Sequence, residues 1–140
     1  QDFENLALMR LGLAQAELHR HHFKAAEAAL LPLVARVEDE PRLAQLRIHI
    51  LLTAAAVALA AGEAPLAAQR ARLALIGLSP SQQHLSAEAA ESLWVLARAL
   101  GPTTREGQDA ARRSRDMLAD PFVVAGCSFA ATTIERWLAP

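Results

Sequence analysis

Several residue types that carry specific structures or chemistry are scarce in this chain of 140 residues. Tyrosine is absent, aromatic residues make up 4%, and long runs of β-branched residues are missing, so little is present from which to build strands. A single cysteine, Cys127, excludes an internal disulfide and fits a reducing compartment, so we expect a cytoplasmic protein. The net charge of −1 provides no overall attraction to nucleic acid or to an anionic membrane.

The sequence also lacks the motifs that indicate a membrane span or an active site. The charge-free run Ile50–Gly62 is shorter than the roughly 20 residues of a span and is rich in alanine, which is typical of a buried core helix. A glycine-rich phosphate loop, a cysteine pair, a Gly-x-Ser-x-Gly turn and a His-Glu-x-x-His pattern are missing. We interpret the histidine cluster His19–His22 as a solvated turn, because no neighbouring ligands complete a metal site. We therefore expect no enzyme, no cofactor and no metal.

What is abundant is alanine and leucine, which raise the hydrophobic share to 53% and are both strong helix formers. A proline and a glycine bracket two apolar runs, Pro41–Gly62 and Pro80–Gly101, and Asp120-Pro121 opens a third. Successive prolines in this series are 39 and 41 positions apart, and an acidic or hydroxyl residue precedes each one. Such caps, with proline at the start and glycine at the end, are typical of helix boundaries. A period in the range of roughly 20–50 residues indicates a stacked helical repeat.

Apolar residues at helical spacing predict about seven helices joined by short turns. Their expected ranges are 2–20, 22–37, 41–61, 64–76, a fifth that includes 87–100, then 105–118 and 120–138. Pro32 lies inside the second range and should kink that helix or end it early. The polar run 79–84 is either the first turn of the fifth helix or a separate turn. The chain then divides into units of about 2–40, 41–79 and 80–120 and a half unit, 121–140, each burying the apolar stripe of its neighbour.

The region from Ala55 to Ala74 resembles the tetratricopeptide repeat. In that repeat a glycine closes the first helix and small residues follow at fixed steps on the second, here Gly62, Ala67, Ala71 and Ala74. The first unit matches in residue type but has His21 at the glycine position, and the third unit has Gly101 there. Further matching positions are Leu13, Ala14, Phe23, Ala26, Leu30, Leu93, Trp94 and Ala110. Together the matches cover nearly the whole chain.

The repeat of 39–41 residues exceeds the usual 34, and such long repeats resemble the sensor region of MalT-type bacterial regulators. The resemblance implies an all-α fold, a right-handed superhelix of stacked antiparallel hairpins. It also implies a non-enzymatic interaction domain of a larger bacterial transcriptional or signalling regulator, in which other domains hydrolyse nucleotide and bind DNA. The family's clamp for a C-terminal carboxylate needs lysine and asparagine, which the inner face lacks, so chaperone-tail binding is disfavoured.

The inner face of the first helix of each hairpin is the predicted binding groove. Six residues on it are expected to contact a protein or peptide partner: Leu11, Gln15, His49, Leu52, Glu91 and Arg98. A small-molecule effector bound between the helices is the first alternative. The second is an oligomerisation or spacer module that dimerises through a terminal helix. We expect no direct nucleic-acid contact, because the arginines of 112–115 are interleaved with aspartates that pair with them locally. Trp94 and Trp137 are expected to anchor the core.

Overall fold

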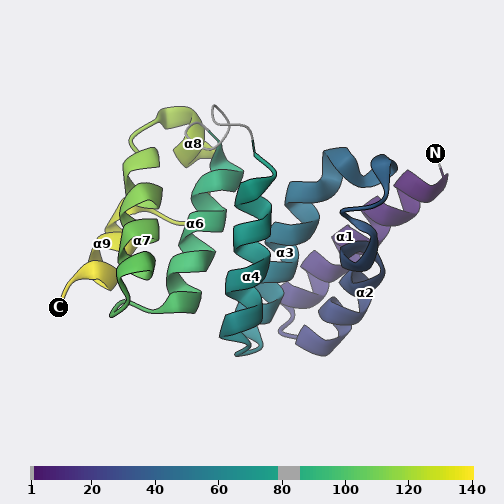
Figure 1. Ribbon diagram of the computed structural model, residues 1–140, viewed down its shortest axis with the longest axis horizontal. Coiled ribbons are helices and arrows are strands. Elements are labelled where there is room, and N and C mark those ends of the chain that lie inside the picture. The colour runs from purple at the N-terminus through teal and green to yellow at the C-terminus, as the bar shows by residue number, and fades with distance from the viewer. Residues whose placement is uncertain (1, 79–85) are drawn as a thin grey trace.

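The computed structural model describes residues 2–78 and 86–140, and all regular structure within them is helical (Figure 1). The all-α prediction is therefore confirmed. The described residues form eight α-helices and one short 3-10 helix, η1. Their bounds are α1 Asp2–His19, α2 Phe23–Arg36, η1 Pro41–Leu46, α3 Arg47–Ala60, α4 Ala64–Ile76, α6 Ala87–Leu100, α7 Arg105–Met117, α8 Pro121–Ala125 and α9 Ala131–Leu138. The polar run 79–84, whose role was left open by its sequence, lies outside the described residues.

The helices lie side by side in a row that runs from the N-terminal to the C-terminal end of the molecule (Figure 1). Each long helix packs on the next one along the chain, from α1 on α2 through to α6 on α7, and α7 packs on α9. The first helix of each hairpin also packs on the first helix of the next, α1 on α3 and α3 on α6. Because α3 contributes to both clusters of buried residues, it joins the two halves of the core.

Each turn between paired helices contains one residue with a positive φ angle. His21, Gly62 and Gly101 have φ angles of 62°, 82° and 91°, and they are 41 and 39 positions apart. In the first two turns the following amide donates to a carbonyl five residues earlier, His22 to Glu17 and Glu63 to Ala58. This bond closes a helix end in the Schellman motif. His21 therefore takes the place that Gly62 takes in the second turn, at the cost of an unfavourable backbone conformation.

The third helix begins later than predicted. Residues 41–46 wind as the 3-10 helix η1, and the α-helix starts at Arg47. Glu40, which the sequence suggested as a cap, makes no side-chain cap bond and instead pairs with Arg36 and Arg42. Without that cap the first turn closes with tighter i to i+3 bonds, such as the one from the Leu43 amide to the Glu40 carbonyl.

The predicted seventh helix is wrong as a single element, since it is divided into α8 and α9. Asp120 does cap its start, accepting a bond from the Phe122 amide at 2.9 Å. Gly126 ends α8 where the chain passes close to the start of α6, and a Cβ at Gly126 would lie 2.7 Å from Ala87 Cβ. Of the two effects expected of Pro32, a kink or an early end, the early end is wrong, because α2 continues through Pro32 to Arg36.

Among the described residues, one stretch, Pro41–Ala60, is long and apolar enough to cross a membrane, with a mean hydropathy of 1.7. This is weak evidence for a membrane helix, because the buried core helix of a folded domain has the same composition. The stretch includes the η1 break, and its helical part, α3, packs on α1, α2, α4 and α6.

Candidate functional site: a hollow across three first helices

A hollow of about 430 Å³ lies across α1, α3 and α6, the first helices of the three hairpins. The segment after α8 contributes to its wall. Its lining comprises Gln15, Leu18 and His19 from α1, His49, Leu52, Thr53 and Ala56 from α3, Ala87, Glu88, Glu91, Val95 and Arg98 from α6, and Gly126 and Ser128. We call this set of residues the central hollow.

The structure brings five of the six predicted groove residues together. Gln15, His49, Leu52, Glu91 and Arg98 all line the central hollow although they come from three different helices. This follows from stacking in register, which places equivalent positions of successive first helices on one side.

Leu11 was predicted wrongly as a groove residue. It is only 6% exposed and belongs to the core cluster that α1 shares with α2 and α3. Sequence reasoning also missed the two residues after α8, Gly126 and Ser128. The Gly-Cys-Ser run at 126–128 was the sequence signal that could have indicated them, because such a run ends a helix readily.

Part of the lining of the hollow is apolar. Leu18, Leu52, Ala56 and Val95 supply this surface, one or two from each helix. Beside it, the Gln15 side-chain amide donates to Thr53 Oγ1 at 3.5 Å and so joins α1 to α3. Apolar surface with a few convergent polar groups is the usual composition of a binding site.

Two carboxylates stand on one face of α6. The Glu91 carboxylate is half-buried, and its burial raises its pKa, with the like charge of Glu88 acting in the same direction. The Ser128 backbone N–H, which donates to Glu91, and the positive Arg98 both oppose that rise. Glu88 Oε1 lies 4.0 Å from Nε2 of His49 on α3. This side of the hollow is thus an acidic subsite whose charge is only partly compensated by the protein.

Arg98 supplies positive charge two turns further along α6. Its guanidinium carbon lies 5.1 Å from the ring centroid of Trp94, an attractive cation–π contact that orients the side chain. Trp94 is itself 6% exposed and contacts the rings of Phe129 and Trp137, so the core position predicted for it is confirmed. Burial lowers the pKa of Arg98 and the nearby Glu91 raises it, and the guanidinium stays charged.

Cys127 sits beside the acidic subsite as an inert thiol. Its Sγ lies 3.8 Å from the Ala87 carbonyl oxygen, and burial, with Glu91 and Glu88 in support, raises its pKa to about 11. A thiol is nucleophilic only when it is deprotonated, so this cysteine is protonated and poorly reactive at neutral pH. Among the described residues, no group of three or more His, Cys, Asp or Glu side chains is placed to hold a metal ion.

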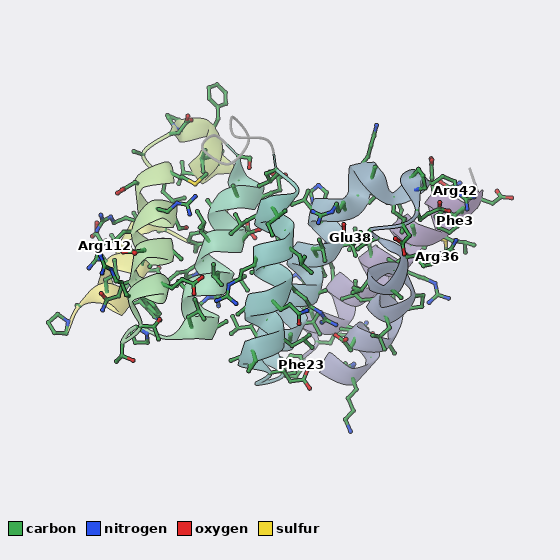
Figure 2. The ribbon with its side chains drawn as sticks, viewed as in Figure 1. Phe3, Phe23, Arg36, Glu38, Arg42 and Arg112 are labelled. Carbon is green, nitrogen blue, oxygen red and sulfur yellow. The ribbon has the colours of Figure 1, made fainter. Side chains whose placement is uncertain are left out.

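The predicted local pairing of the arginines on α7 is present in part. Arg112, which projects from the outer side of the row (Figure 2), lies 3.5 Å from Asp109, and Arg115 lies 3.2 Å from Asp116. These exposed pairs neutralise part of the basic face.

Comparisons of the chain with protein-family models, with curated proteins and with solved structures find no match.

Proposed function

We propose that this chain is a tetratricopeptide-like interaction domain that binds an extended segment of a partner protein in the central hollow. Two observations support the superhelical, repeat-like assignment. First helices pack on first helices, and each second helix packs on the next first helix. The left-handed turn residues recur after 41 and 39 positions. By its resemblance to the MalT-type sensor region, we propose the same role within a bacterial regulator.

The observation that carries this proposal is the convergence of side chains from three successive repeats on one hollow. A core needs apolar residues, but it has no need for Glu91, Arg98 and His49 around the same cavity. The supporting helices are held by the core on their other faces, so the site is formed before a partner arrives. Little ordering cost is then paid on binding.

The charges of the hollow define the chemistry of the partner segment. Glu91 and Arg98 are seven residues apart on α6, which corresponds to about 10 Å along the helix axis. An extended peptide covers that distance with about three residues. We therefore propose a segment with a basic side chain at the acidic subsite, an acidic side chain at Arg98 and an apolar side chain between them.

Selection of a random peptide library against the whole chain tests this proposal. Enriched peptides should carry the basic–apolar–acidic pattern, and their affinities are then measured by fluorescence polarisation. The Leu52→Asp plus Arg98→Glu variant should bind them at least about 10-fold more weakly, a loss of roughly 1.4 kcal/mol or more. Leu31→Asp is the matched control, because Leu31 is 51% exposed and lies outside the hollow. Unchanged binding by the double variant, with its helical circular dichroism intact, would reject the hollow as the site.

A small-molecule effector is the second candidate, and the size of the hollow favours it. Its volume of about 430 Å³ falls within the roughly 300–1,000 Å³ of small-molecule sites. A metabolite that binds there should raise the melting temperature of the wild-type chain and leave that of the Leu52→Asp plus Arg98→Glu variant unchanged. Zwitterionic compounds, with an amine for Glu91 and a carboxylate for Arg98, are the first to screen.

A further inference from the structure

The outward face of α1 carries large apolar side chains that the described residues leave uncovered. Leu6, Met9 and Leu13 are 57%, 69% and 53% exposed, and they recur at the spacing that places them on one stripe of the helix. The start of α1 is nevertheless firmly held, because Phe3 lies under the guanidinium groups of Arg36 and Arg42 (Figure 2). The stripe is thus part of an ordered surface.

The repeat register shows what kind of surface this is. Equivalent positions of α1, α3 and α6 follow from the turn residues and differ by 41 and then 39. Three exposed positions of α1 correspond to positions that are at most 5% exposed in both other helices. These are Met9 with Ile50 and Ala89, Leu13 with Ala54 and Leu93, and Ala16 with Val57 and Leu96. In α3 and α6 this face is buried where neighbouring helices pack on it, so on α1 the same face is a stacking surface.

Gly12 is an independent sign of the same surface. It lies in the middle of α1, where glycine weakens a helix, and a Cβ added to it would meet nothing within 4 Å. The packing seen here therefore gives no reason for a glycine. Its equivalents Thr53 and Ser92 are buried, and Thr53 touches Gln15 of the preceding first helix. A glycine at this position leaves room for another helix to approach closely.

The opposite end of the row, at α9, exposes a different kind of surface. The short helix α9 buries Ile134 against the last hairpin, while Thr132, Thr133, Glu135 and Arg136 are exposed. A polar outer face of this kind closes a stack of repeats. Among the described residues, the outer face of α9 is thus more polar than the outer face of α1.

We propose that a second copy of this chain covers the α1 face, with the two α1 helices antiparallel and related by a two-fold axis. The charges of the helix favour this partner. Asp2 and Glu4 occupy its first turn, and His19 and the exposed Arg20 lie at its other end. An antiparallel pair brings the acidic start of each copy to the basic end of the other. A parallel pair would set like charges together.

The exposed face of α1 is self-complementary when residue i of one copy faces residue 22−i of the other copy. This register sets Met9 against Leu13, Leu6 against Ala16 and Asp2 against Arg20. It also places the long side chain of Arg10 over Gly12, where there is space for it. Every apolar residue of the stripe then meets an apolar residue, as an isologous interface requires.

Sedimentation velocity of the whole chain from about 1 to about 100 µM, a range in which moderate dimers dissociate, tests the association. The wild type should shift from monomer to dimer within it. Met9→Glu places one buried charge from each copy at the interface and should weaken the dimer at least about 100-fold. Ile76→Glu is the matched control, since Ile76 is 73% exposed on α4 and should leave the dimer unchanged. A wild type that stays monomeric, larger oligomers, or a dimer that survives Met9→Glu would overturn the proposal.

Cross-linking tests the register in a Cys127→Ser background. A mixture of Met9→Cys and Leu13→Cys chains should form mixed disulfides in preference to either homodimer. A mixed product in no more than the share expected from random pairing of the two chains would reject the antiparallel register. Because Leu6, Met9, Leu13 and Ala16 of the apolar stripe do not line the central hollow, the dimer and the peptide proposal succeed or fail separately.

Discussion

A buried ion pair between α2 and α4 provides the sharpest test of how the first two hairpins are held together. Arg70 donates to both carboxylate oxygens of Glu27, at 2.8 and 2.6 Å, and also to the Ala54 carbonyl of α3 at 3.0 Å. The Arg70 side chain is 6% exposed and that of Glu27 is 25% exposed. The hydrogen bond from Arg70 is the main cause that lowers the pKa of Glu27, and burial partly opposes it. One guanidinium thus joins three helices.

Removal of Glu27 should be costly, because it leaves a charged guanidinium buried without its counter-ion. Breaking such a pair typically costs about 3–5 kcal/mol. We expect the loss of stability in Glu27→Ala to lie at the lower end of this range, about 3 kcal/mol, because the Glu27 side chain is 25% exposed and water can reach the vacated site. The melting temperature should fall by about 10 °C in a domain of this size.

Urea denaturation of a double-mutant cycle measures the effect. Arg70→Met retains much of the buried volume and leaves a carboxylate that water can reach, so it should cost only about 1–2 kcal/mol. The double variant should be more stable than the sum of the single losses predicts, by about 2 kcal/mol. If the two losses simply add to within about 0.5 kcal/mol, the side chains act independently and the reasoning is refuted.

The same pair predicts a pH dependence. Because the pKa of Glu27 is lower in the folded chain, its stabilisation is fully present above the unfolded value, 4.5, and is lost as pH falls through the folded value. The difference in stability between wild type and Glu27→Ala should therefore be largest near about pH 7 and shrink at about pH 3. An equal difference in stability at the two pH values would mean that the effect of Glu27→Ala arises from lost packing and not from the ion pair.

Two further predictions concern His21 and Cys127. His21→Gly should stabilise the chain by about 1 kcal/mol because it relieves a left-handed φ of 62°, whereas Gly62→Ala, at φ 82°, should destabilise it by about as much. Urea denaturation measures both, and a destabilising His21→Gly would mean that the edge-on contact of His21 with Phe23 outweighs the strain. With its pKa raised from 9.0 to about 11, Cys127 should react with a disulfide reagent near pH 8 about 100-fold more slowly than an unperturbed thiol, and Glu91→Gln should accelerate it. A native rate equal to that of the urea-unfolded chain would contradict the shielding.

Much of the fold was predictable because its signals are local. The spacing of apolar residues, the cap at Asp120 and the glycines at 62 and 101 act within a few residues of the chain. The same periodicity predicted most residues of the hollow, since corresponding positions of α1, α3 and α6 face the same side. Leu11 was the exception. One step around a helix separates a groove residue from a core residue, and only the packing angle of α1 on α2 and α3 decides which it becomes.

By itself, the sequence determined that this protein is helical, where its hairpins turn and which helices share a face, because those properties depend on interactions between near neighbours. The tertiary structure alone decided where the segment after α8 packs. Gly126 meets Ala87 and the Ser128 amide meets Glu91, contacts between residues far apart in the chain. It also decided which apolar positions remain exposed. The stripe on α1 has the composition of the buried stripes on α3 and α6, and it differs from them because no described hairpin packs over it.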